Sequence, residues 1–286
     1  MIIDIHAHPN YYGYNVEKLL ANMDAYGIDK AWILTLETPE GEYHPFWYRH
    51  YGDQFGPMPF SAALEFVRAE PERFVLSYGI DPRRPDAIAK LDAAIDLYNV
   101  KVYGEIMLRM MYDNPDAIKM YQFCGKKKLP VIVEVRYGIP TGQDYPRSEW
   151  WYGGGIDSYA RAIEQCPNTI FFGHGAGFWA HISGDDLYDK VEYPQAEVKP
   201  GGKLLDMLEK YDNLYLDLSA GSGLNALSRD CKLAKDLLIK YQDRAFYGRD
   251  DVNNDLQEFL NTLSLTKAVT DKIYHQNAER VLAEYK

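Results

Sequence analysis

Two histidines near the start of the chain, His6 and His8, are separated by a single residue. Side chains alternate along a strand, so both are expected to point the same way, while Ile3, Ile5 and Ala7 point toward helices. A pair of imidazoles on one strand can grip a transition metal. The alternative is a pair of hydrogen-bonded core histidines, which would need several polar partners.

Two apolar runs further along the chain are also followed by residue types that can bind a metal. His174 lies between two glycines, which allow close approach of a metal or a substrate, and Asp250 follows the last run. Asp250 could hold a metal or take a proton from metal-activated water; an ion pair with Arg249 is its structural alternative. For His174 the structural alternative is a polar cap at a helix N-terminus.

These residues need a fold that brings distant strand ends together. Eight short apolar runs, β-branched or aromatic, are typical of strands buried on both faces. They lie at residues 2–5, 31–36, 74–80, 100–107, 130–135, 170–172, 214–218 and 244–247. Stretches typical of helices lie between and after them, at residues 16–26, 60–70, 85–98, 115–127, 156–166, 202–210, 232–241, 256–263 and 267–285.

Eight strand–helix units predict an α/β protein with a (β/α)8 TIM barrel, formed by residues 1–286 as a single domain. A doubly wound open sheet is the second possibility. The glycine motif that usually marks a dinucleotide-binding sheet is absent after the first run, which favours the barrel.

The composition excludes several classes of protein. The chain of 286 residues is 47% hydrophobic and 26% charged, which is ordinary for a globular protein. Its net charge of −11 disfavours binding to nucleic acid or to anionic membranes. Three widely spaced cysteines fit a reduced, cytoplasmic setting, and we expect neither a signal peptide nor a membrane span.

Three long connections follow strands, so they belong to the face where barrel enzymes carry their chemistry; they lie at residues 37–59, 136–155 and 175–203. His44 and Trp47 in the first are expected to cover a small-molecule substrate, and Trp179 and His181 in the third to line the mouth. Arg136 is a candidate clamp for a substrate carboxylate. Alternatively, the aromatic rings pack the loops onto the barrel or onto a second copy in a homo-oligomer.

Several motifs in this order resemble the amidohydrolase superfamily. They lie at residues 4–8 (DIHAH), 173–177 (GHGAG), 247–250 (YGRD) and 277–282 (NAERVL). The narrower similarity is to its amidohydrolase-related branch (amidohydrolase family 2), with decarboxylases and lactone hydrolases. Segments 198–202 and 217–227 resemble a subgroup of predicted metal-dependent hydrolases.

The resemblance implies a β/α barrel with one or two divalent metals and an activated water. It implies that His6 and His8 are ligands from the first strand. His174 would be a ligand or a catalytic acid, and Asp250 a ligand and proton acceptor.

Two glutamates set this chain apart. Glu134 stands where the family usually has a metal-binding histidine, and Glu105 ends the fourth run, where some members hold an acidic ligand. Zinc is the metal that the family implies, but a carboxylate for an imidazole shifts preference toward manganese, iron or magnesium. If Glu105 also points inward, a second metal, Arg136 or a protonated carboxyl must balance the charge. The alternative is that Glu134 pairs with Arg136 or Lys101 and that metal binding is weak or lost.

The sequence thus predicts a metal-dependent hydrolase that cleaves an ester, lactone or amide with a metal-activated water. Asp250 would accept the proton and His174 would polarise the carbonyl. The first alternative is non-oxidative decarboxylation of an aromatic or unsaturated acid at the same site. The alternative of another class is a metal-poor barrel that binds a ligand without turning it over.

Overall fold

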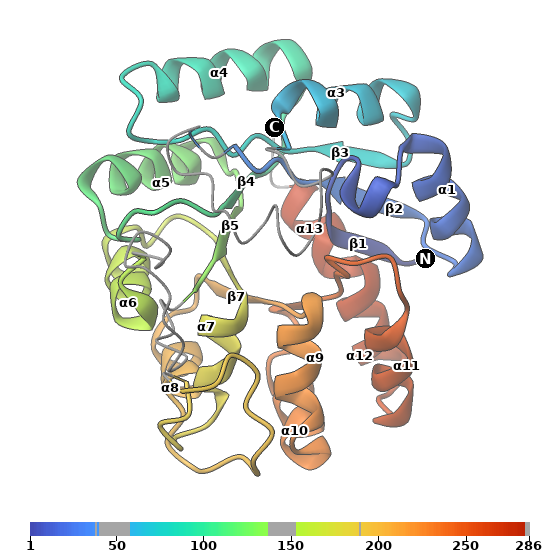
Figure 1. Cartoon of the computed structure of the whole chain (residues 1–286), viewed down its shortest axis with the longest axis vertical. Coiled ribbons are helices and arrows are strands. Elements are labelled where there is room, and N and C mark those ends of the chain that lie inside the picture. Colours follow the sequence, from blue (N-terminus) through green and yellow to red (C-terminus); the bar gives the residue numbers. More distant parts are fainter. Residues whose placement is uncertain (38, 40–57, 137–152, 189, 284–286) are drawn as a thin grey trace.

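The computed structural model describes residues 1–37, 39, 58–136, 153–188 and 190–283 (Figure 1). His44 and Trp47, expected at the substrate site, lie outside the described residues. In the described part, no helix combines the length and the apolar character needed to cross a membrane.

Eight parallel strands form the centre of the molecule, and each matches one of the predicted apolar runs. They are β1 (Ile3–Ala7), β2 (Lys30–Ile33), β3 (Phe74–Leu76), β4 (Tyr103–Ile106), β5 (Val131–Glu134), β6 (Phe171–His174), β7 (Leu214–Asp217) and β8 (Ala245–Phe246). Neighbours in sequence are neighbours in space, in the orders β1-β2-β3 and β4-β5-β6-β7-β8.

Backbone hydrogen bonds join the edges of these two sheets. Between β3 and β4, the amide of Tyr78 donates to the Val102 carbonyl at 3.0 Å. Between β8 and β1, the amide of Ile5 donates to the Tyr247 carbonyl at 3.1 Å. The fold is therefore the (β/α)8 TIM barrel that the strand–helix alternation predicts.

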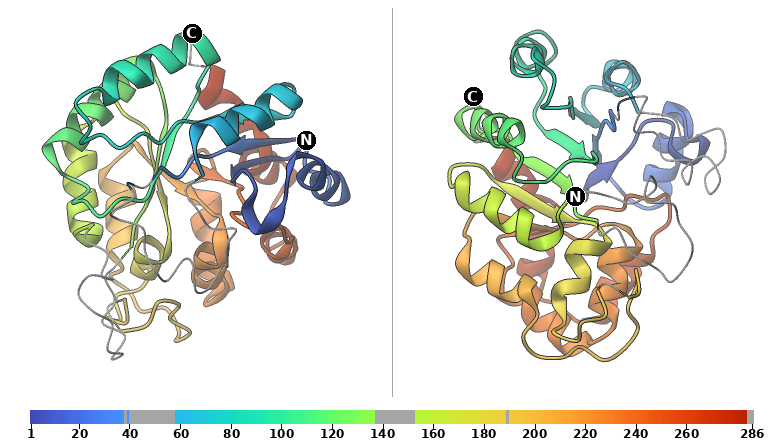
Figure 2. Two further views of the ribbon diagram at one scale, coloured as in Figure 1. Left: turned by 45° about the horizontal axis from the view of Figure 1, so that its top comes forward. Right: turned by 60° about the vertical axis from the view of Figure 1, so that its left-hand side comes forward.

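Helices surround the strands in both further views (Figure 2). The predicted helices are α1 (Val16–Ala25), α3 (Phe60–Ala69), α4 (Ala87–Tyr98), α5 (Pro115–Lys127), α6 (Gly155–Gln165), α8 (Lys203–Lys210), α10 (Cys231–Lys240) and α11 (Asp255–Thr262). The single closing helix becomes α12 (Lys267–Asp271), a π-helical segment (Lys272–Gln276) and α13 (Asn277–Ala283).

Two α-helices in the described part of the chain were not expected, namely α7 (Ala176–Trp179) and α9 (Ala220–Ser228). No helix was expected between residues 210 and 232, and the structure places α9 there, with Gly221 and Gly223 inside it. Gly223 is needed for close packing, because a Cβ there would lie 2.3 Å from the Leu218 carbonyl oxygen. The glycine serves helix–strand contact rather than a turn.

The inside of the barrel corrects a second expectation. Ile3 and Ile5 pack in an inner cluster with side chains from other strands and from α13, whereas Ala7 belongs to the outer core between strands and helices. The pairing of β1 with β2 shifts register between Asp4 and Ala7. This irregularity lets Ile3 and Ile5 share the inner side with the histidines that follow.

Candidate metal centre

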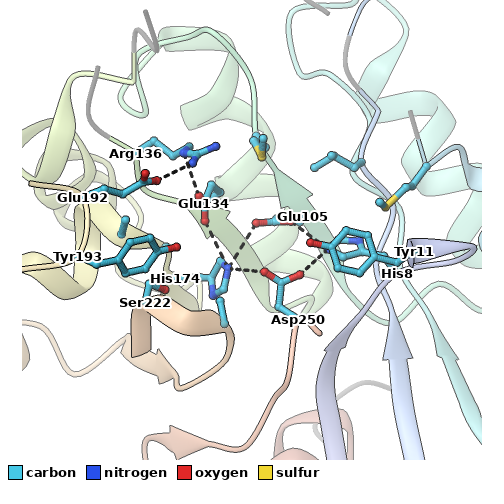
Figure 3. Close-up of a pocket in the computed structure, with 16 residues that line it drawn as sticks. His8, Tyr11, Glu105, Glu134, Arg136, His174, Glu192, Tyr193, Ser222 and Asp250 are labelled. Carbon is cyan, nitrogen blue, oxygen red and sulfur yellow. Dashed lines mark hydrogen bonds and ion pairs between the residues drawn. The ribbon is translucent and has the colours of Figure 1, made fainter. Parts of the chain in front are cut away.

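All six residues that the sequence analysis named as ligands meet where the strands end. They come from β1 and the residue after it, β4, β5, β6 and the segment after β8: His6, His8, Glu105, Glu134, His174 and Asp250. Figure 3 shows five of them converging on one point of a pocket. Every one of the six is buried except Asp250, whose side chain is 17% exposed.

The histidines of the first strand face two carboxylates. The Nε2 atoms of His6 and His8 lie 3.2 Å apart. The Nε2 of His8 lies 3.3 Å from both Glu105 Oε2 and Asp250 Oδ1. The Nε2 of His6 lies 3.5 Å from Glu105 Oε2 and 3.7 Å from Asp250 Oδ1.

The other oxygens of the same carboxylates face His174. The Nε2 of His174 lies 3.4 Å from Asp250 Oδ2 and 3.9 Å from Glu105 Oε1. It also lies 3.3 Å from Glu134 Oε2. Glu105 and Asp250 therefore connect the first-strand pair, of which Figure 3 draws His8, with the pair formed by His174 and Glu134.

The outer nitrogen of each imidazole has its own partner. The Nδ1 of His6 lies 2.7 Å from Asp217 Oδ2, and the Nδ1 of His8 lies 3.0 Å from the Leu34 carbonyl oxygen. Both partners are acceptors, so both Nδ1 atoms carry the hydrogen and the inward Nε2 atoms carry lone pairs when the rings are neutral. The Nδ1 of His174 lies 3.0 Å from the Ser219 hydroxyl, which can donate or accept, so His174 can take either tautomer.

The carboxylates hold the histidines toward their protonated forms. Burial alone would lower the pKa of His8, but hydrogen bonds with Asp250 and Glu105 raise it to about 9. The same competition between burial and the charges of Asp250, Asp217 and Glu105 leaves the pKa of His6 raised. The site favours positive charge at its centre.

The pKa values of the buried carboxyl groups in the cluster shift in two directions. Burial would raise the pKa of Asp250 and Glu105, but the neighbouring histidines hold both below their usual range. Glu134 is different, because burial raises its pKa to about 7 despite the charges of His174 and Arg136.

The donor set fits a divalent cation. Two inward lone pairs only 3.2 Å apart repel each other unless a proton or a cation lies between them and the carboxylates. Ligand atoms 2.1 Å from a tetrahedral metal would lie about 3.4 Å from one another. The distances from the His6 and His8 Nε2 atoms to each other and to the nearest oxygens of Glu105 and Asp250 span 3.2 to 3.7 Å, which matches this spacing.

The cluster forms the floor of a cavity at the carboxyl ends of the strands. One wall is apolar and consists of Tyr11, Leu36, Met58 and Met107. The opposite wall is polar and includes Arg136, Glu192, Tyr193 and Ser222 (Figure 3).

Arg136 lies at the cavity as expected, but two acids already engage it. Its guanidinium lies 2.9 Å from Glu192 and 3.4 Å from Glu134. Trp179 and His181 do not line this cavity. The Trp179 indole is buried and donates to the Asp217 carbonyl at 3.0 Å, and His181 is buried against Tyr188. The unexpected helix α7 carries Trp179 inward instead of leaving it at the mouth.

Three residues near the centre were not predicted as site residues, namely Asp217, Ser219 and Ser222. Asp217 ends β7, so the rule that selected acids and histidines at the other strand ends would have found it. Ser219 and Ser222 belong to a stretch for which no element was predicted, and their types alone carry no signal for this site.

Asp217→Asn is expected to weaken divalent-metal affinity about 10- to 100-fold. Asp217 Oδ1 accepts from the Ser219 amide at 3.0 Å, which would hold the oxygen of an introduced amide on that side. The NH2 group would then face His6 Nδ1 and favour the tautomer with a proton on Nε2, which cannot bind a metal. Competition titration of zinc or manganese against a chromophoric chelator measures the change. Asp212→Asn, at an exposed carboxylate just before β7, is the control; equal affinities in all three proteins would contradict the prediction.

Protein stripped of metal by a chelator is expected to lose stability as the pH rises from about 6.5 to about 9. The pKa of His8 is raised in the folded state, so its protonation stabilises the fold fully below the unfolded value. That contribution disappears as the pH rises through the folded value. Urea unfolding across this range tests the sign. A His8→Gln variant should show a flatter dependence, and a free energy of unfolding that rises over the range would contradict the expectation.

The fold is shared with solved structures at low sequence identity. An uncharacterized TIM-barrel protein from Bordetella bronchiseptica aligns with a TM-score of 0.66 and 17% identity over 99% of both chains. An amidohydrolase from Burkholderia multivorans with bound HEPES gives a TM-score of 0.62 and 15% identity over 99% of both chains. A dihydroxybenzoic acid decarboxylase from Polaromonas sp. JS666, with bound manganese and the inhibitor 2-nitroresorcinol, gives 0.60 and 14%, covering 100% of this chain and 97% of the other.

No protein-family model matches the sequence, and no curated protein matches it. The structural likeness therefore establishes the barrel fold that this chain has in common with amidohydrolases and decarboxylases. The chemistry of the site depends on its own residues.

Proposed function

We propose that this chain is a metal-dependent hydrolase that cleaves an ester, lactone or amide bond in a small molecule. The observation that carries the proposal is the convergence of the His6 and His8 lone pairs with the Glu105 and Asp250 carboxylates at metal-ligand spacing. Solved structures with this fold include an amidohydrolase, which agrees with this reaction class.

His6, His8, Glu105 and Asp250 would hold the metal, with His174 and Glu134 on the far side of the two bridging carboxylates. A divalent ion held there supplies Lewis acidity, which polarises oxygen atoms of substrate and water. The charge of these ligands also fits a divalent cation, because the two ionised carboxylates of Glu105 and Asp250 balance its two positive charges.

Asp250 is the residue proposed to accept the proton from water. Its carboxylate is ionised, and it is the most exposed member of the cluster, so water can reach it. His174 lies 3.4 Å from the second oxygen of Asp250. In the tautomer with a proton on Nε2, His174 can donate a hydrogen bond to the substrate carbonyl and stabilise negative charge on its oxygen.

Decarboxylation of an aromatic or unsaturated acid is the second candidate. Arg136 and the apolar wall of Tyr11, Leu36, Met58 and Met107 favour it, because together they would suit a planar acid. The decarboxylase with bound manganese has the same fold.

Elemental analysis of the purified protein tests both candidates at once. We expect about one or two equivalents of a divalent metal, identified by mass spectrometry. Less than about 0.1 equivalent, unchanged after incubation with zinc, manganese or iron, would defeat both and leave a barrel that only binds a ligand. If metal is present, two assays separate the candidates. Hydrolysis is measured on a set of lactones and esters, and decarboxylation is measured as release of carbon dioxide from aromatic acids.

A further inference from the structure

Ser222 is a buried polar residue that the proposed mechanism does not use. It lies in the first turn of α9, lines the cavity and is 3% exposed. Its hydroxyl finds no hydrogen-bond partner among the residues that the structure describes. Figure 3 draws it on the same side of the pocket as Tyr193 and His174. A buried hydroxyl without a partner costs free energy, and where such a group lines a ligand cavity the missing partner can be the ligand.

The N-terminus of α9 lacks a side-chain cap, and in the described part of the chain only its first amide, that of Ala220, has a partner in another segment, the Arg249 carbonyl at 2.9 Å. A serine in the N-cap position usually accepts a hydrogen bond from an amide of the first turn. Here the N-cap residue is Ser219, and its side chain makes no such bond. Its hydroxyl instead lies 3.0 Å from His174 Nδ1. Holding His174 thus leaves the first turn of a nine-residue helix without a side-chain cap, beside Ser222.

The rest of the cavity indicates what these donors would bind. Across from α9, the Arg136 guanidinium lies against Glu134 and Glu192, so much of its charge is already balanced. The uncapped end of a helix prefers negative charge, and a hydroxyl donor adds direction to that preference. The far wall is apolar, which requires an apolar body on the same ligand.

We infer that the Ser222 hydroxyl and the first-turn amides of α9 after Ala220 bind a carboxylate oxygen of a small amphiphilic acid, whose apolar part lies against Tyr11, Met58 and Met107. This inference rests on the proposed function in one respect: the acid is taken to be the substrate of the enzyme or a competitor of that substrate. The carboxylate would lie beside the metal-ligand cluster, and Ser222 would set specificity for acids over neutral analogues.

Benzoate is the probe, and Ser222→Ala is the variant. We expect benzoate to bind the wild-type protein in the presence of its metal, and the variant to bind about tenfold more weakly by calorimetry. Without benzoate, the variant should unfold at the same temperature as the wild type or higher, because it removes an unsatisfied buried group. A purely structural serine would give the opposite result, with lower stability.

Ser228→Ala is the matched control, since Ser228 is exposed at the other end of α9 and its hydroxyl donates to the Asn225 carbonyl. Benzoate affinity should be unchanged in this control, and metal content should be equal in all three proteins. The inference is overturned if the wild type does not bind benzoate, if Ser222→Ala binds it equally well, or if both variants lose affinity together. A crystal structure with benzoate that places its carboxylate away from Ser222 Oγ also overturns it. A protein without metal that still binds benzoate through Ser222 would refute the proposed hydrolase and leave this inference intact.

Discussion

Asp250→Asn is expected to lower kcat by about 100- to 10,000-fold while the protein stays folded. The asparagine amide cannot accept a proton from water, yet it nearly matches the carboxylate in size. The backbone also favours this substitution, because Asp250 has a φ of 49°, a left-handed conformation that asparagine tolerates better than most residues. The kinetics are measured on the substrate found in the screen, together with circular dichroism of both proteins.

Metal content separates two causes of lost activity. If Asp250→Asn keeps its metal and loses turnover, the carboxylate acts on the proton; if the metal is lost as well, it acts as a ligand. Asp251→Asn is the control, because the neighbouring carboxylate lies outside the metal-site cavity and accepts instead from the Val252 amide at 2.6 Å. Near-normal turnover in Asp250→Asn would remove this residue from the proton path.

The barrel could be predicted because its strands are buried on both faces. Such strands appear in the sequence as short apolar runs, and the eight runs correspond to the eight observed strands. Strand ends then pointed to His174, Glu134, Glu105 and Asp250, since parallel strands in a barrel bring their carboxyl ends to one rim. The structure brings these side chains together with both first-strand histidines.

Side-chain direction along β1 could not be predicted, because it depends on distant residues. Simple alternation turns Ile3 and Ile5 outward if the histidines point inward. In the structure Asp4 lies on the outer side, where it receives hydrogen bonds from the Arg249 amide at 2.9 Å and the Arg249 Nε at 2.7 Å. Arg249 in turn donates to Asn22 of α1 at 2.6 Å. A hydrogen bond between residues 4 and 249 cannot be predicted from the pattern of neighbouring residues along β1.

The residues that orient the ligands were missed for a related reason. Asp217 ends β7, so its place at a strand end was a signal that could have been used, whereas Ser219 contacts an imidazole that is distant in sequence and a lone serine has no spacing signature. The helix that carries Ser222 begins with residues of low helix propensity, Gly221 and Gly223 among them. Gly223 fits this helix because a side chain there would meet the Leu218 carbonyl, a contact that glycine content alone does not predict.

His6→Asn is expected to weaken divalent-metal affinity by at least about 100-fold with a small loss of stability. The amide nitrogen of asparagine can take the place of Nδ1 and donate to Asp217, but nothing replaces the inward lone pair of Nε2. His6→Ala should lose the metal equally and also leave the Asp217 carboxylate, which is fully buried, without its main partner. We expect the alanine variant to be about 2–4 kcal/mol less stable than the asparagine variant.

The two variants therefore separate metal binding from the buried hydrogen bond. Competition titration gives the affinities, and urea unfolding in a chelator gives the free energies. His275→Asn is the control for histidine loss, because the half-buried His275 pairs with Glu279 at 2.9 Å and is not part of the cluster. Wild-type metal affinity in His6→Asn would mean that the inward Nε2 atoms do not form the site. Equal stability of the two variants would mean that the buried Asp217 carboxylate finds another partner when His6 is removed. Its contact with His6 would then serve only to orient the imidazole.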